Sequence, residues 1–281
     1  VRKPADAPYR RVVAAVDFTQ PGGPGLDHFG HGTHLAGIVA GESRDGVTFS
    51  GMAPGAHLVN LRVMDKDGTG FTSDVIEALD WAVANKDRFR IRVVNLSLGH
   101  PIAESWRDDP LVQAVERATA AGLVVVTSAG NLGKTADGTP VVGGIVSPGN
   151  APSAITVGAT NAKDTAARSD DVMATYSSRG PTFKDGLLKP DLVAPGNKVV
   201  SLAAVGSSML REFPEWKIEG GPFDYFRMSG TSMSAAVVAG AAALVLEANP
   251  AVTPAQAKFA LQMTAGRIAE AGLIEQGAGE L

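Results

Sequence analysis

Apolar residues recur along the chain in two alternating patterns. Continuous short runs rich in valine, leucine and isoleucine are typical of buried strands, and five of them occupy residues 11–16, 57–63, 91–96, 123–128 and 154–159. Between these runs, apolar residues fall on one helical face in two segments, residues 75–83 and 111–118. Strands that alternate with helices predict an α/β fold, in which a mostly parallel β-sheet carries helices on both faces.

Capping signals and loop composition indicate how the chain is divided. Pro110 suits the first turn of the helix over 111–118. The stretch Thr253-Pro254-Ala255-Gln256 is a capping box with proline in the first turn, which predicts a last helix. Residues 161–230 are richer in loops, but no sharp change of composition marks a linker. The sequence therefore predicts one domain over residues 1–281.

Composition excludes several classes of protein. With 281 residues, 44% apolar and 19% charged, the chain can bury a sizeable core. The net charge of -4, without a long run of one sign, gives no reason to expect nucleic acid or an anionic membrane as a partner. The longest strongly apolar stretch, 235–246, is too short to span a bilayer and predicts a buried helix. Because cysteine is absent, disulfides, thiol catalysis and thiolate zinc sites are excluded.

Three segments carry residues suited to chemistry. His31, flanked by glycines, precedes an apolar helical stretch, which would let its ring face a cleft. Ser232 would lie in the first turn of a helix, where free N–H groups favour a developing negative charge. Asn131 follows a buried strand and could donate to an oxyanion. Taken singly, each has a simpler structural alternative: a histidine near a helix start, an N-cap hydroxyl and a turn asparagine.

Together these segments resemble the signature blocks of the subtilisin-like serine protease family. GHGTHLAGIVAG is similar to the histidine block, SGTSMSAAVVAG to the serine block and SAGNLG to the oxyanion block. Further similar segments follow in the family's order: GMAPGAHLVNLRVMDKDGTG, VVNLSLG, AITVGAT, YSSRGP and KPDLVAPG. The resemblance covers residues 11 to about 266 and implies the family's three-layer α/β fold.

The resemblance also implies a mechanism and a set of site residues. Ser232 would attack a peptide carbonyl, His31 would transfer the proton, and Asn131 would stabilise the oxyanion before the acyl-enzyme hydrolyses. The resemblance implies that two segments form the walls of a primary pocket: Ser97, Leu98 and Gly99 form one wall, and Ser128, Ala129 and Gly130 form the other. Gly68 and Gly70 would form an edge that pairs with an extended substrate.

The chain departs from the family pattern in two places. Ala236 stands where family members usually have a proline, a change that a helix tolerates because alanine is a good helix former. Residues 197–229 form a longer segment than compact members need, and this segment contains Trp216, Phe223, Tyr225 and Phe226. Its aromatic residues would either reach the cleft or a partner, or form a satellite core beneath a long loop.

The position of the catalytic aspartate departs from the resemblance. Asp17 precedes His31 and ends an apolar run, but Phe18 and Thr19 follow it, whereas the family has Ser or Thr and then Gly. The run RVVAAVDFT and the loop to GHGTH are instead similar to the segment after the aspartate block. We therefore expect the catalytic aspartate upstream of Val1, a chain truncated at both ends, and Asp27 as an acidic neighbour of the active site.

Other functions and cofactors are weighed against this interpretation. If the aspartate is truly absent, a catalytically impaired or non-catalytic subtilase-like binding domain is the alternative. A P-loop fails because Ser128 stands where a glycine is required. A metal site at His28, His31 and His34 is disfavoured because residues spaced by three drift around a helix. The resemblance implies a secreted monomer that acts on polypeptides, without a catalytic cofactor but with structural calcium at unassigned sites.

Overall fold

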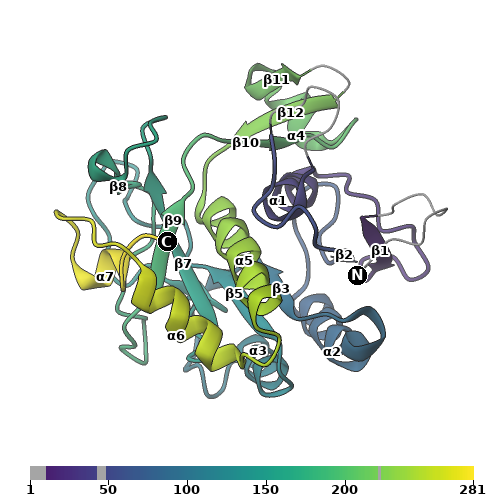
Figure 1. The fold of residues 1–281 in the computed structure, drawn as a ribbon, viewed down its shortest axis with the longest axis horizontal. Helices are drawn as coiled ribbons and strands as arrows, with labels where there is room; N and C mark the ends of the chain where they lie inside the picture. Colours follow the sequence, from purple (N-terminus) through teal and green to yellow (C-terminus); the bar gives the residue numbers. More distant parts are fainter. Residues whose placement is uncertain (1–10, 43–48, 221–222) are drawn as a thin grey trace.

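A layer of parallel strands between two layers of helices forms the centre of the protein (Figure 1). The computed structural model describes residues 11–42, 49–220 and 223–281. The central sheet has the order β3-β5-β7-β9, with a short antiparallel strand β8 at the end of β7. Its strands are β3 (Val93–Leu96), β5 (Val124–Ser128), β7 (Ile155–Asn161), β8 (Val172–Met173) and β9 (Leu192–Pro195).

Helices cover both faces of this sheet, which confirms the predicted α/β fold. One face packs against α2 (Thr72–Phe89) and α3 (Pro110–Ala120), and the other against α5 (Thr231–Ala248) and α6 (Pro254–Thr264). The predicted caps are present. The Asp109 carboxylate accepts from the first-turn N–H groups of α3, and Thr253 and Gln256 form the capping box of α6. These local hydrogen bonds set where the two helices begin.

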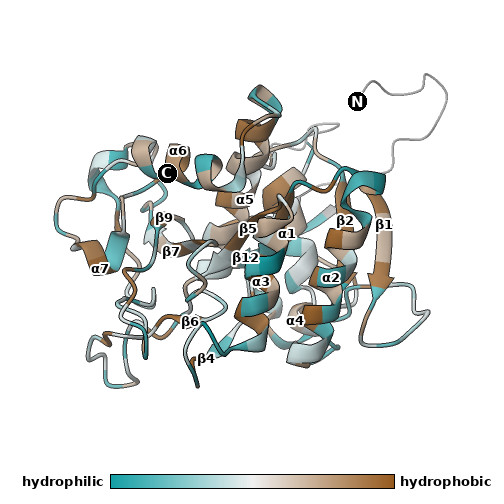
Figure 2. Cartoon of the chain, turned by 90° about the horizontal axis from the view of Figure 1, so that it is seen from below, coloured by the Kyte–Doolittle hydropathy of each residue, from teal (hydrophilic) through white to brown (hydrophobic). Residues whose placement is uncertain are grey.

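The continuous apolar run of β5 follows from its place between the two helical layers. Val125 packs into the cluster under α2 and α3, whereas Val124 and Val126 face α5 and α6. Figure 2 shows both β5 and β7 as largely apolar strands in the interior. Helix α5 is long and apolar enough for a membrane span by composition, but 61% of it is buried inside the protein. It is the core helix that the sequence predicts.

Two further strands form a separate parallel pair beside the central sheet. They are β1 (Val12–Asp17) and β2 (Leu58–Arg62). Leu61 of β2 and Leu96 of β3 belong to the same apolar cluster under α2, yet no hydrogen bond joins β2 to β3 in the described part of the chain. All five residues of β2 are partly exposed, whereas all five of β5 are buried. The sheet therefore has a gap, with one unpaired strand edge on each side.

The segment 197–229 builds a small antiparallel sheet over α1 (His31–Ala40). Its elements are β10 (Val199–Leu202), α4 (Ser208–Glu212), β11 (Lys217–Gly220) and β12 (Phe223–Met228), and the strand order is β10-β12-β11. Tyr225 and Phe226 are buried, and Trp216 lies between Phe213 and Phe226. The predicted satellite core is therefore present, while the side chain of Phe223 lies outside the described residues.

Three short elements complete the fold. Strands β4 (His100–Pro101) and β6 (Val146–Ser147) pair in antiparallel fashion, and α7 (Leu273–Gln276) lies near the C-terminus. The β4–β6 pair joins the segments that leave β3 and β5, so it supports the loops at the carboxyl edge of the sheet.

Candidate active site

Helices α1 and α5 run side by side in the same direction. Leu35 and Ile38 of α1 share an apolar cluster with Met233 and Ala236 near the start of α5. Further along, a Cβ added at Gly240 of α5 would lie 3.4 Å from the carbonyl oxygen of Val39. Since early residues meet early residues and late residues meet late ones, both helices begin at the same end. His31 and Ser232, each in the first turn of its helix, therefore lie on the same side of the molecule.

Ser232 lies directly against the segment that leaves β3. The Ser97 hydroxyl donates to the Ser232 carbonyl oxygen at 2.9 Å, and the Ser232 hydroxyl donates to the Ser97 carbonyl oxygen at 3.4 Å. Asn95 in turn donates from Nδ2 to the Ser97 hydroxyl at 2.9 Å. The N-cap of α5 is Gly230, which has no side chain to cap the helix. Ser232 is thus not an N-cap, and its hydroxyl lies among the free N–H groups of a first turn.

Asn131 is held at this first turn through its amide oxygen. Oδ1 of Asn131 accepts from the Thr231 backbone N–H at 3.0 Å and from the Thr231 hydroxyl at 3.1 Å. The same hydroxyl accepts from the Gly130 N–H at 3.2 Å. Because the oxygen faces α5, the Nδ2 donor of this exposed side chain is turned away from Thr231. Asn131 is therefore linked across the fold to the residue before Ser232, which a turn asparagine would not be.

His31 is the first residue of α1 and is half-buried. The turn before it is held by Asp27, whose carboxylate accepts from the Gly30 N–H at 2.7 Å and from the Thr33 N–H at 2.6 Å. Burial lowers the pKa of His31, and the negative charge of Asp27 partly opposes this. A neutral imidazole can accept a proton from a nucleophile. Among the described residues, however, none holds the ring by a hydrogen bond.

Asp17 is engaged elsewhere, at the end of β1. Its Oδ2 forms an ion pair with Arg62 of β2 at 2.6 Å, and its Oδ1 accepts from the Thr19 N–H and hydroxyl and from the Gln20 N–H. Burial alone would raise the pKa of Asp17, but the hydrogen bonds from Thr19, Arg62 and Gln20 lower it overall. Both oxygens of this carboxylate are occupied, so Asp17 stabilises the junction of β1 and β2.

Two of the three segments predicted for substrate binding lie at the same edge of the central sheet. Leu96 pairs with Thr127, so residues 97–99 and 128–130 leave adjacent parallel strands side by side. The loop that contains Gly68 and Gly70 is a tight turn, in which the Asp65 carboxylate accepts from the Asp67 and Thr69 N–H groups. Gly68 has φ +75°, a conformation that favours glycine.

The three histidines near α1 do not converge on a metal. His34 is fully buried, and its Nε2 lies 2.9 Å from the Phe226 carbonyl oxygen and 3.2 Å from that of Val199. Burial lowers the pKa of His34 to about 4. Within the described ranges, no group of three or more His, Asp or Glu side chains could hold a metal ion. Structural calcium thus stays a prediction without an assigned site.

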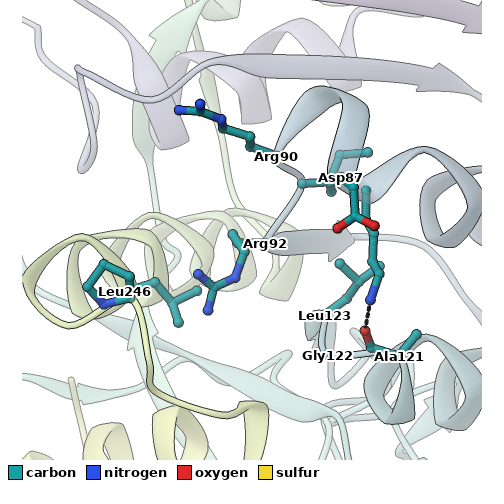
Figure 3. A pocket seen from close by; sticks show the side chains of 10 residues that line it. Asp87, Arg90, Arg92, Ala121, Gly122, Leu123 and Leu246 are labelled. Atoms are coloured by element: carbon teal, nitrogen blue, oxygen red, sulfur yellow. Dashed lines mark hydrogen bonds between the residues drawn. The ribbon is translucent and has the colours of Figure 1, made fainter. Parts of the chain in front are cut away.

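A cavity of about 510 Å³ lies at the opposite edge of the sheet, away from this site (Figure 3). It is lined by the end of α2, by Arg90 and Arg92 ahead of β3, by residues 121–123 ahead of β5, and by Leu246 of α5. Lys86 donates across it to the Ala121 carbonyl oxygen. The cavity therefore marks the amino end of β3, where the unpaired strand edge begins, and not the candidate catalytic residues.

The sequence patterns give no role to two residues with structural contacts, one at the site and one at the junction of β1 and β2. Thr231 orients the Asn131 amide, and Arg62 neutralises Asp17. A signal for Thr231 is its position directly before Ser232. No local signal identifies Arg62, because its contact with Asp17 depends on how β1 pairs with β2.

Comparisons with known proteins agree with this geometry. The sequence profile of the subtilase family matches residues 4–279. Serine protease AprX of Bacillus subtilis is 39% identical over 259 residues, covering 90% of this chain and 56% of the relative. Subtilisin E of the same species is 34% identical, covering 86% and 52%. The chain thus spans about half the length of these curated relatives.

Solved structures show the same fold. Sphericase matches with a TM-score of 0.73 and 27% identity, covering 94% of this chain and 82% of its own. A cold adapted subtilisin-like serine proteinase matches with a TM-score of 0.69 and 29% identity, covering 92% and 77%. On the family match, the similar sequences and the shared fold, this chain belongs to the subtilase family.

Proposed function

We propose that the protein is a serine endopeptidase. Ser232 attacks the carbonyl carbon of a peptide bond, while His31 takes the hydroxyl proton and passes it to the leaving amine. Asn131 donates from Nδ2 to the oxygen that becomes negative. Water then attacks the acyl-enzyme, with His31 again as the base, and releases the acid product and free Ser232.

The observation that carries this proposal is the orientation of Asn131. Thr231 holds the amide oxygen at 3.0 and 3.1 Å, which leaves the Nδ2 donor free beside the first turn that contains Ser232. A preorganised donor of this kind acts where charge develops, in the transition state. The lowered pKa of His31 supports its role as a base, because the imidazole is neutral at pH 7.

The proposed substrate is an extended polypeptide. Residues 97–99 and 128–130 leave neighbouring strands at the carboxyl edge of the sheet, which supports the proposal that they form the walls of a primary pocket. The turn at Gly68 and Gly70 supplies backbone groups for strand addition, a mode in which main-chain hydrogen bonds hold an extended chain. A similar protein from Thermus sp., 35% identical over 89% of this chain, is named an extracellular serine proteinase, and from this we infer a secreted protein. We further propose that it is monomeric and needs no cofactor for catalysis.

The carboxylate that orients His31 belongs, in this proposal, to a strand between β2 and β3. Within the described ranges, neither strand has a hydrogen-bonded neighbour on the edge that faces the gap, and both strands contribute to one apolar cluster under α2. A parallel strand placed there would end beside Ser97, next to the first turn of α5. A carboxylate at that end can fix the tautomer of His31 and stabilise the imidazolium. Asp17 is disfavoured for this role, because Arg62 and Thr19 already bind its carboxylate and no hydrogen bond joins it to His31 among the described residues.

Hydrogen exchange in the full-length protein tests the inserted strand. Amides of β2 and β3 that face the gap should be protected as strongly as those of β5, since a paired amide exchanges only on opening. Fast exchange of these gap-facing amides, with β5 protected, would contradict the proposal. The matched control is the opposite set of amides in β3, which already pair with β5.

Fluorophosphonate labelling of the full-length protein tests the enzyme itself. We expect one covalent adduct on Ser232, found by mass spectrometry of the labelled peptide, and no adduct in Ser232→Ala. A protein that is folded but takes no Ser232-dependent label would contradict the enzyme. It would instead favour the non-catalytic subtilase-like binding domain, an alternative that is supported by the lack of a hydrogen bond to the His31 ring among the described residues.

A further inference from the structure

Asn95 is a polar residue on the face of β3 that packs against α5. Val94 and Leu96 point toward the apolar cluster under α2 and α3, whereas Val93 packs into the cluster that contains α5. Because side chains alternate along a strand, Asn95 points to the same face as Val93. Its Oδ1 is buried and accepts no hydrogen bond within the described ranges. A buried oxygen without a partner costs free energy, so stability alone does not account for an amide at this position.

The amide nitrogen of Asn95 begins a chain of two hydrogen bonds that ends at the proposed nucleophile. Nδ2 of Asn95 donates to the Ser97 hydroxyl at 2.9 Å, and this hydroxyl donates to the Ser232 carbonyl oxygen at 2.9 Å. A serine hydroxyl has two lone pairs and one proton, and the proton rotates to suit its neighbours. Because Nδ2 can only donate, Asn95 occupies a lone pair of Ser97 and leaves the proton for Ser232. Asn95 therefore sets the direction of both bonds.

These bonds hold the backbone of Ser232 more firmly than its side chain. The Ser232 hydroxyl donates to the Ser97 carbonyl oxygen at 3.4 Å, which is a long hydrogen bond. The bond to the Ser232 carbonyl oxygen has the normal length of 2.9 Å, and the N-cap Gly230 offers no side chain to fix this turn. The main chain of Ser232 is thus anchored, while its hydroxyl is free to leave Ser97 and turn toward the base.

We propose that Asn95 positions the nucleophile: through the Ser97 hydroxyl it fixes the backbone of Ser232, so that rotation of the serine side chain brings its oxygen to the substrate carbonyl carbon. This inference rests on the proposed function. Asn95 is a positioning residue, because it acts through Ser97 and not on the reacting atoms. A displacement of a reacting group by about 1 Å can cost about a hundredfold in rate. Loss of this anchor should therefore lower kcat more than it changes KM.

The test replaces Asn95 in the full-length protein by leucine, an apolar side chain of the same branched shape. Titration with the fluorophosphonate counts reactive Ser232, so kcat is expressed per reactive site and misfolded molecules do not contribute. Asn95→Leu should lower this kcat by about tenfold or more and change KM by less than about threefold, and Asn95→Ala should do the same. Thr127→Val is the matched control, because it removes a buried hydroxyl of β5 that donates to Thr156. It should keep kcat within about twofold.

A double-mutant cycle tests whether Asn95 acts through Ser97. In the Ser97→Ala background, Asn95→Leu should change kcat by less than about twofold, because the hydroxyl that Asn95 orients is gone. An effect as large as in the wild-type background overturns the inference and leaves the proposed function intact. So does an unchanged kcat per reactive site in Asn95→Leu and Asn95→Ala, or an equal loss in Thr127→Val. Absence of any Ser232-dependent hydrolysis in the wild type overturns the proposed function, and this inference with it.

Discussion

Acidification should destabilise the protein through His34. This side chain is fully buried in α1, and its Nε2 lies 2.9 Å from the Phe226 carbonyl oxygen of β12. Burial lowers its pKa from 6.5 to about 4, with the nearby His31 adding to the shift. The unfolded chain therefore binds a proton at a higher pH than the folded protein does. The neutral His34 ring makes its full contribution to the free energy of unfolding above pH 6.5, and this contribution is lost as the pH falls toward 4.

The size of this effect follows from the pKa shift. A difference of about 2.5 units, at about 1.4 kcal/mol per unit, corresponds to a loss of about 3 kcal/mol between pH 7.5 and pH 4. The variant His34→Gln places an amide nitrogen near Nε2 and can still donate to Phe226, but it does not titrate. The free energy of unfolding of this variant should therefore not include the loss of about 3 kcal/mol that protonation of His34 causes in the wild type.

Urea unfolding at several pH values measures the difference. The free energy of unfolding of the wild type minus that of His34→Gln should decrease by about 3 kcal/mol from pH 7.5 to pH 4. All other groups, including His31 and Glu280, titrate in both proteins and largely cancel. A difference that stays constant across this range would refute the reasoning, because it would mean that His34 has the same pKa in the folded and unfolded states.

Three further predictions address other parts of the structure. Asn131→Ala should lower kcat about 10²- to 10³-fold in steady-state kinetics, as expected for one lost oxyanion donor; a loss below threefold would exclude that role. Asp17→Asn should cost about 3–5 kcal/mol in urea unfolding, because it leaves Arg62 unpaired, yet the folded fraction should label at Ser232 at the normal rate. Glu280→Gln should stabilise the protein more at pH 8 than at pH 5, since burial raises the pKa of Glu280 to about 7; equal stabilisation at both pH values would argue against that shift.

The elements that are encoded locally were predictable from the sequence. The apolar runs at 123–128 and 154–159 became β5 and β7 because their side chains are buried on both faces of one sheet. The capping box at Thr253 and the cap at Asp109, followed by Pro110 in the first turn of α3, determine helix starts through bonds within one turn. Such signals need no knowledge of the rest of the fold. The small sheet of 197–229 has no comparably regular pattern, so the sequence predicts only a long loop there, whose aromatic residues either reach the cleft or a partner or form a satellite core.

In the candidate site, too, the local features are visible in the sequence and the long-range contacts are not. His31, Ser232 and Asn131 were identified from short segments, because their residue types and neighbours are visible in the chain itself. How they act together was not visible. The bond from Thr231 to Asn131 joins residues 100 positions apart, and the Arg62–Asp17 pair joins residues 45 apart. Each depends on which strands are neighbours.

The sequence by itself determined the alternation of strands and helices, the starts of capped helices and the identity of the chemical groups, because those follow from periodicity and from contacts within a few residues. Only the tertiary structure decided that α1 and α5 begin at the same end, that Asp17 is neutralised by Arg62, and that a gap separates β2 from β3. These features depend on strand order and helix direction, which are set by burial summed over the whole core and have no local signature.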